Sequence, residues 1–399
     1  MMADARQAAE GVARASYGRL VALLSARTRD IAAAEDALAE AFRAALETWS
    51  VRGVPERPEA WLLIAARRAF GHTLRHRAVR DAAAATLSLL EAETHGEASP
   101  VFPDERLKLL FVCAHPAIDG AARTPLMLQT VLGLDAGRIA AAFVTAPATM
   151  AQRLVRAKAK IRDAGIRFEE PDADALPARL ASVLSAIYAA YGTGWDEGLG
   201  TGLTGEAIFL GRLLVALQPD APEARGLLAL MLHCEARAQA RRGPDGAYVR
   251  LAEQDTRLWS PELIAEAEGH LIVAARRATF GRFQTEAAIQ SVHAQRAVTG
   301  TTDLRALCTL YDLLAEHAPT IGVLVSRAAI HGEASGPEIG LALLDALDSD
   351  RVASYQSFWA VRAHLLRAAG RRAEAAPALD RAIGLSDDPA VRAYLARQR

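Results

Sequence analysis

The sequence predicts an all-α protein made of several helical domains. Alanine is abundant, runs of β-branched residues are rare, and no segment shows a convincing period-two alternation of apolar and polar residues. Apolar residues instead recur at helical spacing along nearly the whole chain. With 399 residues, of which 51% are hydrophobic and 23% charged, the chain is long enough for two or three globular domains.

The first predicted domain is a helical block over residues 8–85. Asp30 opens a run of acidic and apolar residues that continues to Trp49, and this run predicts a helix with an acidic first turn. A loop with Gly and Pro follows, and a further helix is expected to begin near Glu59. The second half of that helix is basic, with no acid before Asp81, and contains Arg67, Arg68, Arg75, Arg77 and Arg80. This block therefore has a basic patch of its own.

The second predicted domain covers residues 104–168, after a linker over residues 86–103 that contains Gly and Pro. One apolar face at helical spacing predicts a helix, and it consists of Leu126, Met127, Thr130 and Val131. Gly133 is expected to end this helix, as glycine commonly does. A short second apolar face follows, formed by Ile139, Ala140 and Phe143.

A strongly basic helix is expected next, with Thr145 as its N-cap and Pro147 in its first turn. Its inward stripe has the spacing i, i+4, i+7 and i+11 and consists of Met150, Leu154, Ala157 and Ile161. Between Arg153 and Arg167 there are six Lys/Arg and one acid. A short helix, a turn and a basic helix predict a helix-turn-helix that reads a DNA major groove.

The residues of this helix that lie off the inward stripe are expected to face the DNA; they are Thr149, Gln152, Arg153, Arg156 and Lys160. Thr149, Gln152 and Arg153 lie near the helix N-terminus and are expected to reach base edges, whereas Arg and Lys contact phosphates. An ordinary helix with a solvated charged face is the alternative. The turn, the expected cap and the preceding helix all favour the DNA reader.

The third predicted domain covers residues 176–399 and consists of many helices. Residues 363–383 place Gly370 between two helical stretches and resemble the tetratricopeptide repeat, and residues 310–328 are a weaker copy. Such a helical-repeat stack offers a concave binding face, and a plain helical bundle is the alternative. Six glycines between Gly192 and Gly205 predict a flexible loop near the start of this domain.

Charge is divided unevenly along the chain. Residues 1–167 contain 23 Lys/Arg and 18 Asp/Glu, whereas the remainder contains 23 Lys/Arg and 29 Asp/Glu. The basic excess therefore lies in the half that contains the predicted helix-turn-helix. This polarity is typical of a protein in which one half binds nucleic acid and the other half binds something else.

Two basic helical blocks separated by a linker resemble regions two and four of an extracytoplasmic-function sigma factor, a promoter-recognition subunit of bacterial RNA polymerase. The whole chain resembles the long subgroup of this family, in which a tetratricopeptide-like domain follows region four. The segments that carry the resemblance are residues 30–49, 58–70, 104–117, 139–161 and 206–214.

The resemblance implies that core RNA polymerase and promoter DNA are the partners. The implied −35 reader consists of Thr149, Gln152, Arg153, Arg156, Lys158 and Lys160. The implied −10 contacts are Arg67, Arg68, Arg75 and Arg77. The implied polymerase-binding residues are Asp30, Glu35, Asp36, Glu40 and Phe42. A regulatory protein, or an intramolecular contact, is expected at the acidic C-terminal domain.

Two other functional interpretations stay open. A helix-turn-helix regulator or adaptor that does not join RNA polymerase would explain the basic helix, but it leaves the first block without a role. A scaffold whose DNA-binding elements have decayed is a third interpretation, because the segment Gly71–His76 departs from the sigma-factor pattern. Binding to core polymerase and salt-dependent binding to DNA distinguish the three.

The sequence argues against an enzyme. Cys113 lies two residues before His115 and His233 precedes Cys234, but residues this close on a helix do not face one another. No second Cys/His pair has zinc spacing, and no Gly-rich loop follows a predicted strand. We therefore predict no catalytic residue, no metal and no cofactor.

The sequence also predicts a cytoplasmic protein without a membrane partner. No apolar run reaches eighteen residues, and the N-terminus lacks the apolar core of a signal peptide. The three cysteines are widely separated and do not make a disulfide framework, as expected for a reducing compartment.

Overall fold

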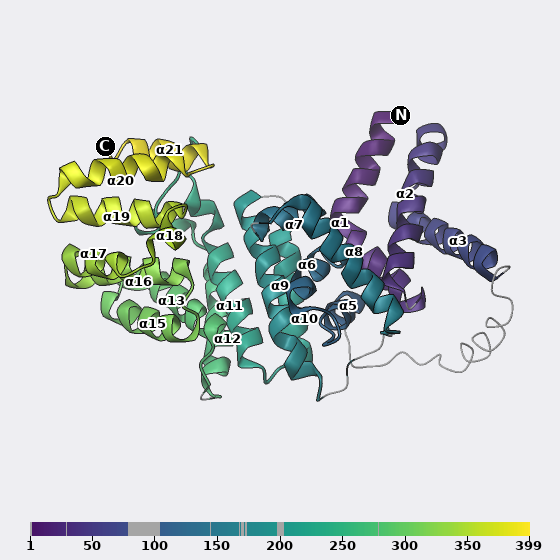
Figure 1. The fold of residues 1–399 in the computed structure, drawn as a ribbon, viewed down its shortest axis with the longest axis horizontal. Helices are drawn as coiled ribbons and strands as arrows, with labels where there is room; N and C mark the ends of the chain where they lie inside the picture. Colours follow the sequence, from purple (N-terminus) through teal and green to yellow (C-terminus); the bar gives the residue numbers. More distant parts are fainter. Residues whose placement is uncertain are drawn as a thin grey trace. The chain divides into compact units, whose positions relative to one another are not determined.

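The computed structural model describes residues 2–28, 30–78, 104–143, 145–166, 168, 171, 174–197, 203–277 and 279–399. Within these ranges every regular element is a helix, apart from one isolated antiparallel bridge between Arg242 and Tyr248 (Figure 1). The all-α prediction is confirmed. The chain divides into two compact units, Met1–Leu217 and Gln218–Arg399. The predicted linker, residues 86–103, lies outside the described residues.

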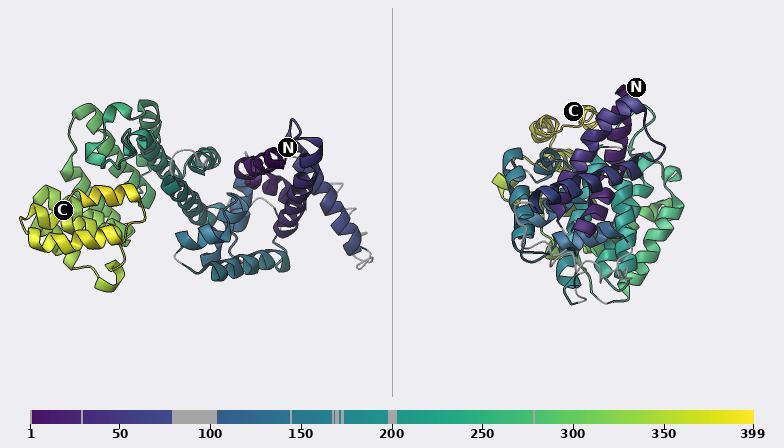
Figure 2. Two further views of the ribbon diagram at one scale, coloured as in Figure 1. Left: turned by 90° about the horizontal axis from the view of Figure 1, so that it is seen from above. Right: turned by 90° about the vertical axis from the view of Figure 1, so that its right-hand side faces the viewer.

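The first unit begins with three long helices, α1 (Met2–Thr28), α2 (Ile31–Arg52) and α3 (Pro58–Ala78). Helices α1 and α2 lie side by side, and both pack against α3 (Figure 1, Figure 2). Their shared core includes Leu20, Leu24, Leu38, Trp49 and Leu62. As predicted, the second helix opens at Asp30, whose carboxylate accepts a hydrogen bond from the backbone N–H of Ala33 at 3.0 Å.

Six further helices follow in the described part of this unit: α5 (Glu105–Cys113), α6 (Gly120–Thr130), α7 (Ala136–Ala142), α8 (Pro147–Asp163), α9 (Leu176–Glu197) and α10 (Leu203–Leu217). Helix α6 packs against α8 and α9, and α9 packs against α10. The boundary between the two units falls after Leu217, whereas the sequence predicts a C-terminal domain over residues 176–399.

Helix α1 joins the two predicted DNA-binding blocks. It packs against α5 and α6, and at Gly18 it comes very close to the backbone of Val131 at the end of α6. A Cβ atom on Gly18 would lie 1.5 Å from the carbonyl oxygen of Val131, so only glycine allows this approach. Gly133, two residues further along, has φ 67° and ends the turn after α6, as the sequence predicts.

The second unit is a series of helices in which the largest helix contacts join helices that are adjacent in sequence or two apart. The longer members are α11 (Pro222–Ala236), α12 (Pro261–Ala275), α13 (Arg282–Ala294), α15 (Leu304–His317), α16 (Ile321–Ser335), α17 (Pro337–Asp345), α19 (Gln356–Ala368), α20 (Arg372–Gly384) and α21 (Pro389–Ala396). Short pieces connect them: η1 (Ala238–Arg241), η2 (Leu251–Glu253), η3 (Thr256–Leu258), α14 (Arg296–Thr299) and α18 (Ser349–Val352). Gly370, with φ 78°, lies in the turn between α19 and α20.

The prediction of a glycine loop is wrong for three of its six glycines, because these three lie in helices. Gly192 and Gly194 lie within α9 and Gly205 lies within α10, whereas residues 198–202 are outside the described chain. The reason at Gly194 is packing. A Cβ atom there would lie 2.9 Å from the backbone nitrogen of Thr204, so the glycine allows α9 and α10 to approach closely.

No helix in the described part of the chain is both long enough and apolar enough to cross a membrane.

Candidate nucleic-acid interface

Helices α7 and α8 cover the segment predicted as a helix-turn-helix, and they pack against each other. The carboxylate of Asp135 begins α7 by accepting hydrogen bonds from the backbone N–H groups of Gly137 and Arg138, at 2.9 and 3.0 Å. Pro147 is the first residue of α8, as predicted, but the N-cap position is Ala146 and not Thr145. Ala146 has the extended backbone that the residue before a proline favours, with φ −70° and ψ 138°.

The predicted inward stripe of α8 is confirmed, because Met150, Leu154, Ala157 and Ile161 are all buried. The side chains predicted to face DNA lie at the surface, with Thr149, Gln152, Arg156 and Lys160 exposed and Arg153 half-buried. Phe143 was expected in the apolar face of the preceding helix, but it lies just beyond α7 and is 37% exposed. Helix α8 thus has one buried face and one exposed polar and basic face.

Lys158 does not share that exposed face. Its Nζ forms an ion pair with Oε2 of Glu35 on α2, and the two side chains are only 19% and 12% exposed. Burial raises the pKa of Glu35, and the charge of Lys158 and its hydrogen bond oppose that rise. The structure therefore brings together one residue of the predicted −35 reader and one of the predicted polymerase-binding residues.

The other predicted polymerase-binding residues divide into two groups. Asp30 is the N-cap of α2, and Phe42 is partly buried beside a groove between α1 and α2 that Leu46 also lines. Asp36 and Glu40 are exposed on the outer surface of α2. Glu40 accepts a hydrogen bond from Nε of Arg43 at 3.0 Å.

Helix α3 presents Arg67 and Arg68 at its exposed surface. The side chains of Arg75 and Arg77 are outside the description, although their backbone belongs to α3. Trp61 at the start of α3 packs edge-on against Trp49, with ring centroids 5.5 Å apart. This tryptophan is therefore part of the core of the three-helix block.

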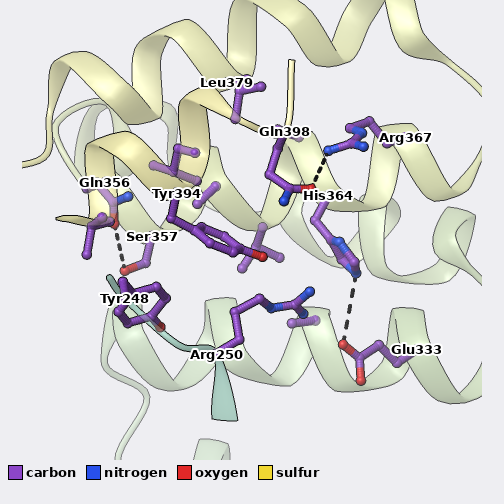
Figure 3. A pocket seen from close by; sticks show the side chains of 16 residues that line it. Tyr248, Arg250, Glu333, Gln356, Ser357, His364, Arg367, Leu379, Tyr394 and Gln398 are labelled. Carbon is purple, nitrogen blue, oxygen red and sulfur yellow. Dashed lines mark hydrogen bonds and ion pairs between the residues drawn. The ribbon is translucent and has the colours of Figure 1, made fainter. Parts of the chain in front are cut away.

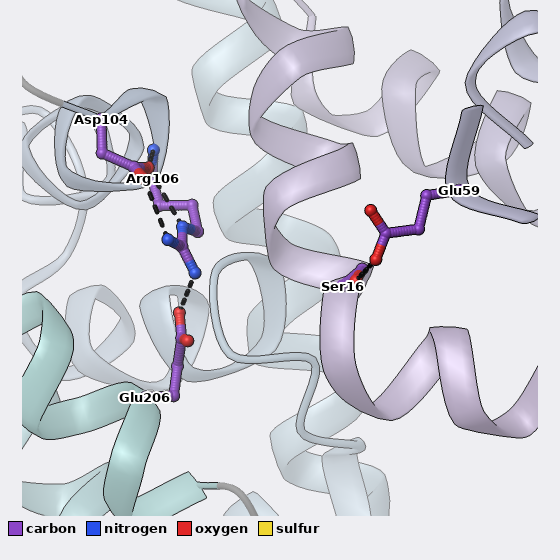
Figure 4. A network of polar contacts seen from close by, with 5 residues as sticks. All are labelled: Ser16, Glu59, Asp104, Arg106 and Glu206. Atoms are coloured by element: carbon purple, nitrogen blue, oxygen red, sulfur yellow. Dashed lines mark hydrogen bonds and ion pairs between the residues drawn. The ribbon is translucent and has the colours of Figure 1, made fainter. Parts of the chain in front are cut away.

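Two polar contacts in this unit were not predicted (Figure 4). Ser16 on α1 donates a hydrogen bond to Glu59 on α3. Arg106 on α5 donates to Asp104, at 2.9 and 3.0 Å, and also to Glu206 on α10. No spacing pattern in the sequence signals that Arg106 and Glu206 meet, because 100 residues separate them.

The contacts with Arg106 affect the pKa values of both carboxylates. Burial works to raise the pKa of Asp104, but hydrogen bonds from Arg106 and its charge bring that pKa below its ordinary value. Burial raises the pKa of Glu206, and Arg106 limits this rise. The guanidinium thus links the start of α5 to α10.

Comparisons with known proteins place the chain among relatives without a described activity. Residues 179–275 match a family of unknown function, DUF6596, and this match runs from α9 to the end of α12. The chain is 37% identical over 382 residues to Uncharacterized protein R00370 of Rhizobium meliloti (strain 1021), which covers 93% of the chain and 90% of that protein. The chain belongs to the family of this rhizobial protein. No solved structure matches it.

The matched region contains the adjacent residues His233 and Cys234, for which the sequence predicts no catalytic or metal-binding role. His233 is 1% exposed on α11, and burial, followed by the charge of Arg237, lowers its pKa to about 4. Its Nε2 lies 3.5 Å from Oε1 of Glu268, so at neutral pH this is a contact of a neutral imidazole with a carboxylate. Cys234 Sγ lies 3.7 Å from Nη2 of Arg237.

The other pair is divided between interior and surface. Cys113 is fully buried on α5 beside the Thr130 hydroxyl, at 3.6 Å, and burial raises the pKa of its thiol to about 12. His115 lies outside that core and accepts a hydrogen bond from the backbone N–H of Ala117 at 3.1 Å. Among the described residues, no three His, Cys, Asp or Glu side chains are grouped closely enough to hold a metal ion.

Proposed function

We propose that this protein is an alternative sigma factor of the extracytoplasmic-function type. It binds core RNA polymerase, recognises promoter DNA and carries a regulatory helical-repeat domain of tetratricopeptide type. The observation that carries the proposal is the geometry of α8. Its apolar stripe is buried while Thr149, Gln152 and Arg156 are exposed on the other side, directly after the short helix α7.

In this proposal α8 enters the major groove at the −35 element. Thr149 and Gln152 lie in the first turns of the helix, where side chains reach base edges. Arg156 and Lys160 lie further along the exposed face and bind phosphates, so the affinity falls as salt rises. Arg153 lies between these two groups in the sequence and is half-buried, and it contributes to base reading or to phosphate binding.

Helix α3 supplies the second DNA contact in the same unit. Arg67 and Arg68 are exposed and bind the backbone of the unpaired −10 strand, and Arg75 and Arg77 continue the same basic run. The packing of Trp61 against Trp49 supports a role in the core and not in base stacking.

Helix α2 is the proposed polymerase-binding element. Among the predicted polymerase-binding residues on α2, Asp36 and Glu40 are exposed, whereas Glu35 is paired with Lys158 of α8. Binding of α2 to polymerase at Glu35 therefore competes with the contact between α2 and α8. This competition would couple the arrival of polymerase to the release of α8 for DNA.

The test is run-off transcription with purified core RNA polymerase and the full chain on candidate promoters, together with co-purification. We expect association with core polymerase and a promoter-dependent transcript. With the variant Arg156→Gln/Lys160→Gln we expect most of the run-off transcript to disappear, while the association with core polymerase is kept. Arg305→Gln, an exposed arginine on α15, is the matched control and is expected to transcribe normally.

Each negative result has its own meaning. Salt-dependent DNA binding without polymerase association would indicate a helix-turn-helix regulator and not a sigma factor. The absence of both, in a chain that folds normally, would indicate a scaffold.

A further inference from the structure

The second unit contains a cavity of about 380 Å³ that is lined by side chains from five separate segments. The segment before η2 contributes Tyr248 and Arg250, α16 contributes Glu333, and α19 contributes a row of side chains that includes His364 and Arg367. The last helices, α20 and α21, close the remaining side. Figure 3 shows these side chains pointing toward a common space.

One side of the cavity is cationic. Arg250 and Arg367 both line it, and Glu333 is the sole carboxylate among its lining residues in the described chain. Nη1 of Arg367 donates to Oε1 of Gln398 at 2.9 Å, which orients this guanidinium at the cavity rim. Nη1 of Arg250 lies 3.8 Å from Oε1 of Glu253, a residue outside the cavity.

A histidine lies between the two arginines. His364 is on α19, one turn before Arg367, and its Nε2 is 4.0 Å from Oε1 of Glu333 (Figure 3). Burial lowers the pKa of His364, and the positive charges of Arg250 and Arg367 lower it further, whereas Glu333 works in the opposite direction. Two guanidinium groups and one carboxylate line this end of the cavity, so its net charge is positive and favours an anion.

The opposite side is apolar and aromatic. Tyr394 packs edge-on against Tyr248, with ring centroids 5.5 Å apart and an interplanar angle of 72°. Leu379, Val391 and Leu395 also line the cavity and belong to the same apolar cluster as Tyr394. A ligand that fills the space would thus place an apolar body against this side and an anionic group toward the arginines.

We propose that this cavity is a binding site for a small organic carboxylate with an aromatic or aliphatic body. The volume lies at the lower end of the range for ligand pockets, ~300–1,000 Å³, which suits a small molecule. Arginine is the side chain best suited to a carboxylate, because its planar N–H groups match the two oxygens. The proposal does not depend on the sigma-factor function.

The experiment measures binding of 3-phenylpropionate to the full chain by isothermal titration calorimetry and saturation-transfer NMR. Its neutral amide, 3-phenylpropionamide, has the same body without the charge. We expect the carboxylate to bind more tightly than the amide. The variants Arg250→Gln and Arg367→Gln are each expected to lower the affinity for the carboxylate about tenfold or more, because each removes a charged hydrogen-bond donor.

Arg305→Gln is the matched control and is expected to bind like the unmodified chain. Both arginines of the cavity are at least partly exposed, so the variants are expected to fold, and circular dichroism checks this. Equal binding of the acid and the amide overturns the proposal. So does unchanged binding in both arginine variants, or no binding of the carboxylate at millimolar concentration.

Discussion

Arg106 illustrates how a single residue can join distant parts of this chain. Its side chain is 11% exposed, and it contacts Asp104 at the start of α5 and Glu206 on α10. Two carboxylates face one guanidinium, so its removal would leave both without their compensating charge. The energetic role of Arg106 therefore comes from its burial and its partners, and not from its local position on α5.

We predict that Arg106→Met lowers the free energy of unfolding of the first unit by on the order of 3 kcal/mol. The reason is that Asp104 and Glu206 would lose their buried counter-charge. Urea denaturation followed by circular dichroism measures this change. Arg27→Met, an exposed position in the last turn of α1, is the control, and an equal loss in both variants would contradict the prediction.

A second prediction at this scale concerns two histidines of the second unit, of which His233 is buried and His293 is half-buried. Burial, followed by nearby arginines, lowers the pKa of both His233 and His293 from 6.5 to about 4. The unfolded chain therefore binds more protons than the folded one between pH 6.5 and 4. The free energy of unfolding should fall as pH decreases through this window, by at most about 1.4 kcal/mol per pH unit for each histidine.

Urea denaturation of the full chain at pH 7, 6 and 5 measures this slope in the transition of the second unit. In the variant His233→Asn/His293→Asn the slope between pH 6.5 and 5 should become flatter. An identical slope in the variant would show that other groups cause the acid sensitivity.

At the scale of elements, local signals predicted where several helices begin and end, and tertiary packing decided the exceptions. Asp30 begins α2 because its carboxylate accepts a hydrogen bond from a backbone N–H of the first turn. Gly133 ends the turn after α6 because glycine adopts a positive φ without strain. At Gly194, by contrast, the sequence predicts a loop, but this residue lies inside α9. Its small size serves the contact with α10, which no local pattern reveals.

Helix α1 offers a matched pair of glycines that tests this distinction. Gly18→Ala should destabilise the first unit by roughly 1–3 kcal/mol, because the new Cβ would collide with the backbone at Val131. Gly11→Ala meets no atom within 4 Å and should stabilise α1 by up to about 1 kcal/mol through helix propensity. Thermal unfolding measures both, and the same sign for the two variants would contradict the prediction.

At the scale of the whole molecule, the division after Leu217 places α9 and α10 with the predicted DNA-binding helices. Arg179 on α9 donates through Nη1 to the carbonyl oxygen of Phe111 at 3.2 Å. The face that α9 buries in this unit includes Val183, Leu184, Ala186, Ile187, Ala190 and Tyr191. A chain that ended before α9 would therefore expose the apolar surfaces of α5 and α6.

We predict that a fragment of residues 1–217 unfolds cooperatively and stays monomeric, whereas a fragment of residues 1–167 melts at a lower temperature and aggregates. The physical reason is the loss of the apolar area that α9 and α10 cover. Calorimetry and size-exclusion chromatography of the two fragments provide the measurement. Equal melting temperatures would place the folding boundary near residue 167 instead.

The sequence alone determined the all-α class, the inward stripe of α8 and the helix starts at Asp30 and Pro147. These features depend on residues within a few positions of one another, where periodicity and capping act. Only the tertiary structure decided that Lys158 pairs with Glu35, that Arg106 meets Glu206, and that Arg250 shares a cavity with Arg367. Such contacts join residues about a hundred positions apart and arise from the packing of whole helices, which no local pattern encodes.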